Sequence, residues 1–207
     1  MRWLPLLCAA LLSSACVTPV ALDAAIRPAL PPGERSSEKA GVVCSPDLLG
    51  HVERAHPSTL TGFANSYQFE LGQPLCNALF KSVESSYRAA VRASTPYYRG
   101  EFGRVVQFAL QDSSLSIAPR ADRTTRVAYA LSVVVERYGR DLRLESRNVL
   151  SGYGLVDAPR LSDAVVKEVV EDALQQVANE TTTLLVARID GPRVATPRGF
   201  DPAAPED

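Results

Sequence analysis

The sequence predicts an α+β domain in which a mostly antiparallel sheet of four to five strands packs two helices on one face. One observation is the strict alternation of apolar residues between Val127 and Val135, which is typical of a strand buried on one side. A second is the three-and-four spacing of apolar residues over 76–91 and 166–184, which indicates two buried helix faces. The order strand, strand, helix, three strands, helix favours both helices on one side of the sheet.

The first half of this domain is expected to contain two strands and a helix. A short apolar run at 40–44 ends before Pro46, and apolar residues alternate over 63–71, so both segments are predicted strands. Pro74 stands where a first helical turn tolerates a missing N–H, and Pro96 disfavours helix at the residue before it. We therefore expect one continuous helix between these two prolines.

The second half is expected to contain three strands. Alternation at 106–110 and 115–117 predicts strand, with a bulge or a turn between the two runs. The strand over 127–135 leads to a predicted hairpin loop at 139–141. The returning strand is expected to run from 142 to about residue 150.

The last helix is expected to begin after Ser162, whose side chain can accept backbone N–H bonds as an N-cap. Gly152 and Gly154 precede it and indicate a turn between strand and helix. The odd-numbered face of 127–135 and the two helices are expected to form one core.

Length and composition bound the function. The 207 residues are 46% hydrophobic, which is ordinary for a globular chain, and the length suggests one domain. The 22 basic residues are balanced by 23 acidic ones. Nucleic-acid binders normally carry a basic excess to neutralise phosphates, so we expect no nucleic-acid partner.

The first residues have the pattern of a secretory signal. Arg2 precedes an apolar run over 3–12, and the small residues of 13–15 follow. The apolar run is well short of the roughly 20 residues that a helix needs to cross a bilayer. We therefore predict a cleaved leader at 1–15.

The residue after this leader is Cys16, and the segment 1–16 resembles the signal peptide of bacterial lipoproteins. The resemblance implies that the Cys16 thiol carries fatty acids such as palmitate, although Ser13 stands where the family usually has Leu. It also implies the periplasmic face of the outer membrane, because Val17 and not Asp follows the cysteine. The alternative is an ordinary secreted protein in which Cys16 is a plain thiol.

The mature chain has a central body between two Pro-rich ends. Prolines without a sustained apolar period predict a tether at 16–39 that spaces the body from the membrane. The body is expected at 40–189, and a Pro- and Gly-rich disordered tail at 190–207.

Two cysteines remain for the body, Cys44 and Cys76. An even pair in an oxidising compartment predicts a disulfide, with two buried free thiols as the alternative. Such a bridge closes a loop of about 30 residues and would stabilise the fold by ~3–4 kcal/mol.

The sequence contains no strong catalytic or metal-binding pattern. His51 and His56 are five residues apart, so they do not share a helix face as the two histidines of HExxH do. Neither GxSxG nor a phosphate-binding glycine pattern occurs. We expect no catalytic residues, no metal and no cofactor.

Basic residues gather around the predicted hairpin, and these are Arg137, Arg140, Arg143 and Arg147. Guanidinium groups pair well with phosphate oxygens, so one interpretation is a patch that faces anionic headgroups or lipopolysaccharide. The other interpretation is a solvated hairpin tip.

The even-numbered face of the clearest strand carries small or mildly apolar residues, Ala128, Ala130, Ser132 and Val134. A fully wet sheet face usually carries more polar side chains, so these residues suggest a surface that a protein partner covers. The alternative is that a loop of the same chain, over 45–62, covers this face.

The order of elements over 40–189, and the stretch YQFELG at 67–72, resemble a loose group of bacterial envelope lipoproteins. The group includes the lipopolysaccharide-assembly lipoprotein LptE, YajG-like lipoproteins and the auxiliary lipoproteins of ABC-type transporters. The resemblance implies a non-enzymatic structural or assembly component of envelope lipid or lipopolysaccharide transport, with an envelope protein as partner. The alternatives are a periplasmic binding module for a lipid, glycan or peptide, which predicts an internal cavity, and an enzyme of unrecognised type.

Overall fold

The computed structural model of the chain describes residues 16–22, 26–29, 35–55, 65–96 and 101–187. The predicted leader at 1–15 and tail at 190–207 lie outside these residues. The described elements are β1 (Cys16–Pro19), β2 (Ser36–Cys44), α1 (Pro46–Leu49), β3 (Val52–Ala55), β4 (Asn65–Glu70), α2 (Gly72–Ser86), β5 (Tyr87–Arg92), β6 (Arg104–Pro119), β7 (Thr125–Tyr138), β8 (Leu144–Ala158) and α3 (Asp163–Ala187).

The large sheet has five strands in the order β5-β2-β6-β7-β8. The strands β6, β7 and β8 form an antiparallel meander of 14- to 16-residue strands, while β2 runs parallel to both β5 and β6. The α+β class is therefore confirmed, but the expected mostly antiparallel pattern is wrong at the β2 side of the sheet. Parallel neighbours need a long crossover, and α2 supplies part of the one between β2 and β5.

A second sheet of three strands, β1-β4-β3, was not predicted. Its β1 lies within the predicted 16–39 tether and pairs in parallel with β4, and Val20 and Ile26 are buried. Its β3 spans only four residues. Strands this short show too little alternation to be recognised against a turn.

The helix predicted between Pro74 and Pro96 ends at Ser86, and the following residues form β5. The hydroxyls of Ser85 and Ser86 both donate to the Ser82 carbonyl, in competition with the helical backbone bonds. Tyr87 then adopts an extended conformation, with φ −120° and ψ 159°. The expected helix was too long because Ala90 and Val91 fit a helical face as well as a strand.

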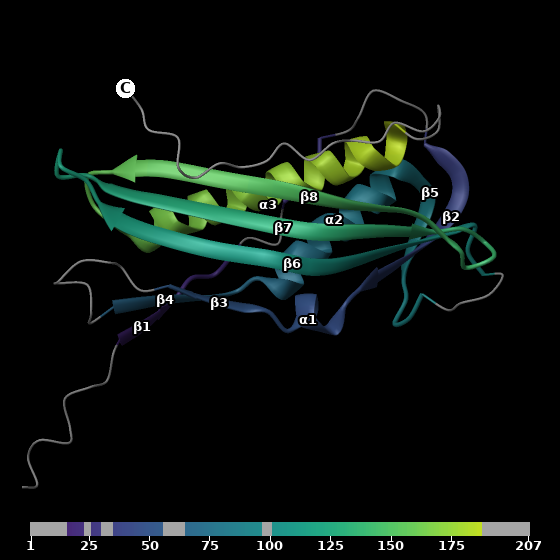
Figure 1. The fold of residues 1–207 in the computed structure, drawn as a ribbon, viewed down its shortest axis with the longest axis horizontal. Coiled ribbons are helices and arrows are strands. Elements are labelled where there is room, and N and C mark those ends of the chain that lie inside the picture. The colour runs from purple at the N-terminus through teal and green to yellow at the C-terminus, as the bar shows by residue number, and fades with distance from the viewer. Residues whose placement is uncertain (1–15, 23–25, 30–34, 56–64, 97–100, 188–207) are drawn as a thin grey trace, which may run out of the picture.

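The main core lies between the large sheet and α2 and α3, as expected (Figure 1). From β7 it takes the odd-numbered residues 127–135, and Tyr129 packs edge-on against Phe69 of β4 at a centroid distance of 5.9 Å. The Ser82 hydroxyl of α2 donates to the Ala178 carbonyl of α3 at 2.8 Å, which ties the two helices together.

The predicted disulfide is confirmed. Cys44 at the end of β2 is bonded to Cys76 in α2, with Cα atoms 6.2 Å apart. Within the described part of the chain, none of the helices combines the length and apolarity required to span a bilayer.

Candidate functional site

The face of the meander turned away from the helices is the most unusual surface of this fold. In Figure 1, α2 and α3 lie behind β6, β7 and β8, so this opposite face is turned toward the viewer. Register places even-numbered residues of β7 beside odd-numbered residues of β8 on this face. We call the following set the open face: Arg126, Ala128, Ala130, Ser132, Val134 and Glu136 of β7, with their partners Asp157, Leu155, Tyr153, Ser151, Val149 and Arg147 of β8.

The open face has a relief of large and small side chains. Val149, Tyr153 and Leu155 of β8 are 43%, 37% and 43% exposed, and we call this row the ridge. Beside it, the small side chains of Ala128, Ala130 and Ser132 of β7 form a lower strip, which we call the trough. Tyr153 and Leu155 are neighbours on this face, and Ser151 separates them from Val149. Exposed apolar side chains gathered along one strand indicate a surface that another molecule covers.

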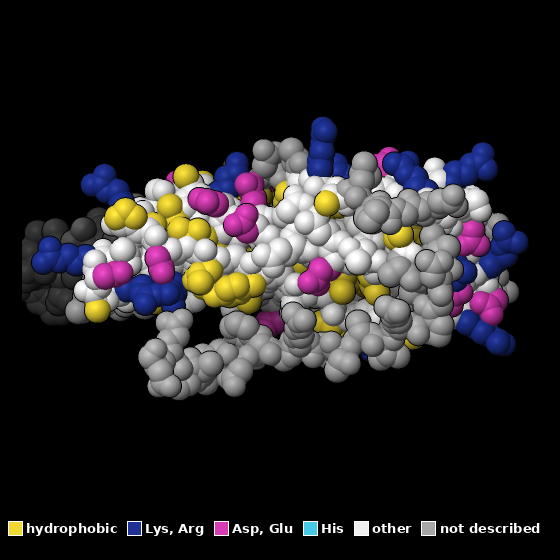
Figure 2. Space-filling view, turned by 90° about the horizontal axis from the view of Figure 1, so that it is seen from above, with side chains coloured by type: hydrophobic (Ala, Val, Ile, Leu, Met, Phe, Trp, Pro, Cys, Tyr) yellow, Lys and Arg dark blue, Asp and Glu magenta, His cyan; other side chains and the backbone are white. Residues whose placement is uncertain are grey.

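Each end of the open face carries an ion pair. At one end the Arg126 guanidinium donates two bonds of 3.0 Å to Asp157. At the other end Arg147 lies 3.6 Å from Glu136. Figure 2, seen from the edge formed by β8 and α3, shows Lys and Arg at both ends of the elongated molecule and a few along its middle, where hydrophobic side chains also lie. An apolar centre with a polar rim is the common arrangement of protein interfaces.

A bulge in β6 shapes a hollow at one side of this surface. The β6–β7 register shifts between Leu110 and Asp112, so the expected bulge or turn is a bulge within one strand. The hollow beside it has a volume of about 540 Å³ and is lined by Gln107, Ala109, Leu110, Gln111, Val134, Glu136, Arg147 and Val149.

The chain covers part of this side of the sheet by itself. Phe102 packs with Val43 and Val105 in a small separate cluster near the hairpin end. The alternative that a loop over 45–62 covers the even-numbered face is wrong for its described part, 45–55. The Ser113 hydroxyl contacts His51 and Glu53, and Ser113 is paired with Leu131 on the helix side of the sheet. Residues 56–62 lie outside the described residues.

The predicted partner residues Ala128, Ala130, Ser132 and Val134 therefore do lie together on one face, but the ridge beside them was missed. The returning strand runs to Ala158 and not to about residue 150. Gly152 and Gly154 are not in a turn: a Cβ at either position would overlap the backbone carbonyl of Ala173 or Val169 in α3. The signal that could have revealed the ridge is that the glycines alternate with exposed Ser151, Tyr153 and Leu155.

Helix α3 also closes the centre of the free edge of β8. The Gln176 side chain accepts from the Tyr153 N–H at 3.1 Å and donates to the Tyr153 carbonyl at 2.7 Å. One turn later Glu180 accepts from the Ser151 N–H; burial raises the pKa of the Glu180 carboxyl and this bond partly offsets the rise. An added strand therefore finds the middle of this edge occupied, and contact through the face is favoured.

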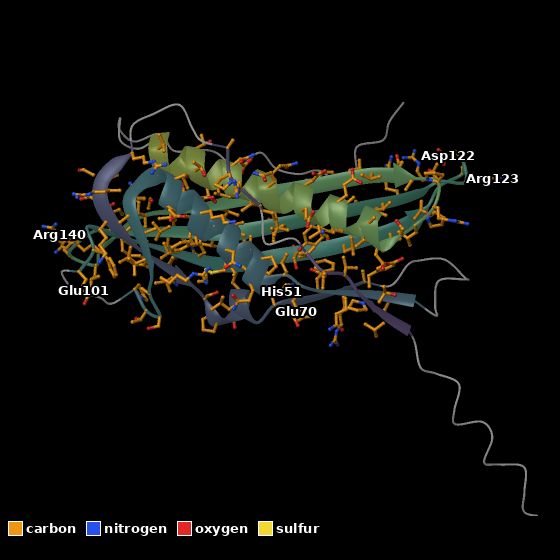
Figure 3. The ribbon with its side chains drawn as sticks, turned by 180° about the vertical axis from the view of Figure 1, so that it is seen from behind. His51, Glu70, Glu101, Asp122, Arg123 and Arg140 are labelled. Carbon is orange, nitrogen blue, oxygen red and sulfur yellow. A yellow bond between two sulfur atoms is a disulfide. The ribbon has the colours of Figure 1, made fainter. Side chains whose placement is uncertain are left out.

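The four arginines predicted as an anion-facing patch do not form one surface. Arg137 lies 3.3 Å from Glu145 and is 15% exposed in its side chain, on the side of buried Tyr87. Arg147 lies on the open face with Glu136, and Arg143 lies 3.3 Å from Asp141. Arg140 is exposed at the end of the molecule opposite Asp122 and Arg123 (Figure 3). Neighbouring carboxylates reduce the positive potential around three of the four guanidinium groups.

The predicted lipidation residue Cys16 is the first residue of β1 and is paired with Asn65 of β4. Figure 3 shows β1 on the side of Arg123, away from Arg140. The predicted anchor and the predicted anion-facing hairpin thus lie toward opposite ends of the protein.

A polar cluster joins the two sheets. The Ser113 hydroxyl donates to Glu53 at 2.5 Å and lies 2.9 Å from His51 Nε2, which is itself 3.4 Å from the Glu53 carboxylate. The buried Tyr129 phenol stays protonated, because burial and the nearby Glu53 carboxylate raise its pKa above the ordinary value. Serine and carboxylate meet the same ring nitrogen, whereas a catalytic triad needs them on opposite nitrogens. The cluster therefore lacks the geometry of a triad, and its hydrogen bonds connect β3 to β6.

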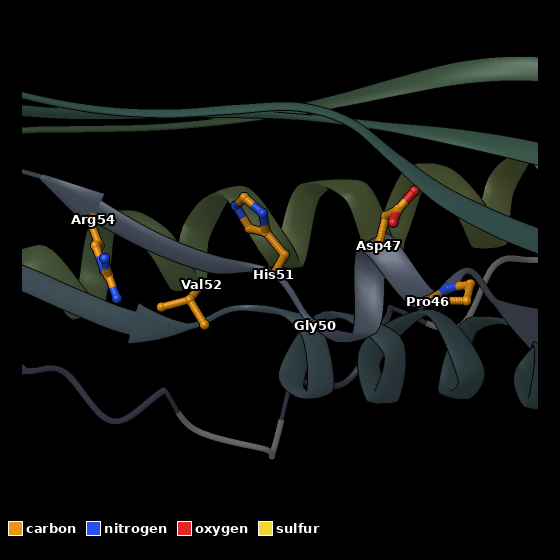
Figure 4. A pocket seen from close by; sticks show the side chains of 6 residues that line it. All are labelled: Pro46, Asp47, Gly50, His51, Val52 and Arg54. Carbon is orange, nitrogen blue, oxygen red and sulfur yellow. The ribbon is translucent and has the colours of Figure 1, made fainter.

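Beside this cluster is a second surface hollow of about 560 Å³ (Figure 4). Its lining residues are Pro46, Asp47, Gly50, His51, Val52 and Arg54. Among the described residues, no three His, Cys, Asp or Glu side chains are placed to hold a metal ion, and His56 lies outside them.

The arrangement defines an elongated α+β protein whose sheet is packed by helices on one side and, as far as the described residues extend, is left uncovered over β7 and β8 on the other. The crystal structure of protein XCC0632 from Xanthomonas campestris, of family DUF330, is similar, with a TM-score of 0.55 and 12% identity, over 83% of this chain and 95% of that one. A PelC dodecamer from Paraburkholderia phytofirmans has a TM-score of 0.33 and 11% identity, over 70% and 93% of the two chains. The sequence matches no known family and no curated protein. The likeness to XCC0632 establishes the fold.

Proposed function

We propose that this protein is a lipid-anchored, non-enzymatic component of envelope lipid or lipopolysaccharide transport, and that its open face docks a protein. The observation that carries the proposal is the ridge, in which three large apolar side chains remain 37–43% exposed between two ion-paired ends. Burial of such a row on association removes apolar surface from water at about 25 cal/mol per Å².

Two further observations support an envelope location. The Cys44–Cys76 bridge is typical of a protein that folds in an oxidising compartment. The sequence before β1 resembles a lipoprotein leader ending at Cys16, and acyl chains on that cysteine would hold the protein at a membrane surface. The outer membrane, on its periplasmic side, is the location we propose.

A periplasmic binding module for a lipid, glycan or peptide is the second candidate. It is favoured by the hollow of about 540 Å³ beside the β6 bulge, where Arg147 and apolar Val134 and Val149 meet. The space between sheet and helices, where this second candidate predicts an internal cavity, holds core side chains such as Tyr129 and Leu174, which are fully buried. A ligand would therefore bind in a surface hollow, such as the one beside the β6 bulge.

The anchoring part of the proposal is tested by labelling cells with a radioactive fatty acid and fractionating their membranes. We expect label on the protein and recovery with the outer membrane, and loss of both in a Cys16→Ser variant. An unlabelled protein found in the cytosol with its leader uncut would refute the proposed location and role.

The docking part is tested by placing a photocrosslinking phenylalanine analogue at Tyr153 in cells. The matched control is the same group at Leu144, which is 52% exposed on β8 and lies beyond the Glu136–Arg147 end of the open face. We expect protein crosslinks from position 153 and few from position 144. Lipid-only adducts at position 153 would support the binding module instead.

A further inference from the structure

We propose that the occupant of the open face is a second copy of this chain, related to the first by a two-fold axis that runs between β7 and β8. This inference rests on the proposed docking role of the face and names its partner. A two-fold interface requires a surface that is complementary to itself. The relief and the charges of the open face meet that requirement.

The relief is self-complementary because its high and low strips lie side by side. A two-fold axis parallel to the strands and midway between β7 and β8 places Tyr153 and Leu155 of the ridge of one copy over the trough of the other. Tyr153 then faces the small Ala130 of the second copy, and Leu155 faces its Ala128. Each of these two large side chains is offered the space that a small one leaves, whereas Val149 faces Val134 of the second copy.

The charges are self-complementary for the same reason. Each ion pair has one member on each of the two strands that exchange places. Glu136 therefore faces the Arg147 of the second copy, and Arg126 faces its Asp157. Packed sheets cross at about 30°, which moves the outer positions sideways, but the long arginine side chains can bridge that shift.

The size of the surface suits a reversible dimer. Only β7 and β8 exchange places about this axis, so the 14 residues of β7, at about 3.4 Å each, and two strands about 4.8 Å apart give a face of roughly 460 Å² per copy. That area is below the roughly 800 Å² per partner of a standard specific interface and lies in the range of weak, reversible complexes. The α3 side chains that occupy the middle of the β8 edge also disfavour the rival arrangement, in which two copies join their sheets edge to edge.

The first test measures self-association of the full-length protein, purified from membranes in mild detergent, by sedimentation equilibrium. We expect a monomer–dimer equilibrium that Leu155→Asp weakens by at least about tenfold. The matched control Leu144→Asp, on a leucine that is 52% exposed beyond the Glu136–Arg147 end of the open face, should leave the dimerisation constant within about twofold. A wild-type monomer throughout the concentration range, or equal effects of the two variants, would overturn the proposal.

The second test checks the two-fold arrangement itself. Glu136→Arg and Arg147→Glu each place like charges across the proposed interface, so each variant alone should dimerise about tenfold less than wild type. Mixing the two variants restores opposite charges at both contacts, whereas the like-charged pair inside each chain persists. Native mass spectrometry should therefore show the mixed dimer in excess of both homodimers; a random mixture would overturn this geometry.

These tests separate the inference from the proposed function. If the protein is a monomer but Tyr153 still crosslinks to another envelope protein, the open face docks a different partner and only the dimer is wrong. If Cys16 carries no fatty acid while the dimer forms, the dimer stands and the anchored role is wrong.

Discussion

The two faces of the β6–β7–β8 meander are built from the same strands, yet they have different chemistry. On the helix side of β7, Tyr129, Leu131 and Val133 are at most 1% exposed and pack against α2 and α3. On the open face the neighbouring strand leaves Tyr153 and Leu155 37% and 43% exposed. The comparison indicates that one face is needed for folding and that the other is free to serve association.

The largest contrast is expected between two tyrosines on opposite faces. Tyr129→Ala removes a fully buried ring and should lower the free energy of unfolding by about 3–5 kcal/mol. Tyr153→Ala removes a ring that is 37% exposed and should cost less than about 1 kcal/mol in the monomer. Urea denaturation of both variants checks the difference; similar losses would mean that the open face also belongs to the core.

The disulfide is expected to stabilise the helix side of the sheet without changing the open face. Replacing both Cys44 and Cys76 by Ser removes a bridge between residues 32 apart in the sequence. This change should lower the free energy of unfolding by about 3–4 kcal/mol. Denaturation of wild type with and without reductant gives an independent value. Because the bridge joins β2 to α2, crosslinking from Tyr153 should persist at temperatures where the double variant remains folded.

The glycines of β8 sharpen the comparison within a single strand. Gly154→Ala brings a Cβ against the Val169 carbonyl of α3. Because the backbone of β8 or α3 must move to make room, the free energy of unfolding should fall by about 2–3 kcal/mol. Ser151→Ala, on the open face of the same strand, should change the stability by less than about 0.5 kcal/mol. Thermal unfolding of the pair tests this, and a neutral Gly154→Ala would show that α3 adapts easily.

The smallest effect is expected at the β8 edge, where Glu180 accepts from the Ser151 N–H. Burial raises the folded-state pKa of the Glu180 carboxyl above its usual value of 4.5. The carboxyl is neutral in both states below pH 4.5 and costs no stability there, but the free energy of unfolding falls as the pH rises from 4.5 through the raised pKa. Glu180→Gln keeps the acceptor oxygen without the charge. The variant should match wild type at low pH and be slightly more stable at neutral pH; a gap in the opposite direction would contradict this account.

Much of the fold could be predicted, because long elements repeat their period many times. The strand over 127–135, the two-helix core, the Cys44–Cys76 bridge and the small side chains of the open face follow from such patterns. The parallel strand β5 could not be predicted, since Ala90 and Val91 satisfy both periods. The second sheet was missed because β1 and β3 have four residues each.

The ridge was missed for a different reason. Gly152 and Gly154 usually indicate a turn, but here they allow close approach of α3, which lies far along the chain. Only the tertiary structure reveals that role. The interpretation of the four arginines as one anion-facing patch also fails for a tertiary reason, because residues close together in the sequence around the hairpin lie on different sides of the sheet. Arg137 lies near Tyr87, whereas Arg147 lies on the open face.

The contact between α3 and the edge of β8 has a consequence for biogenesis. Gln176 and Glu180 occupy the backbone groups of Tyr153 and Ser151, and they come from the last described element of the chain. Because the chain is synthesised from its N-terminus, the meander is complete before α3 has emerged. A nascent molecule therefore passes through an interval in which the backbone groups of the β8 edge are unpaired and can bind strands of other molecules. A chaperone that covers this edge during that interval would prevent aggregation.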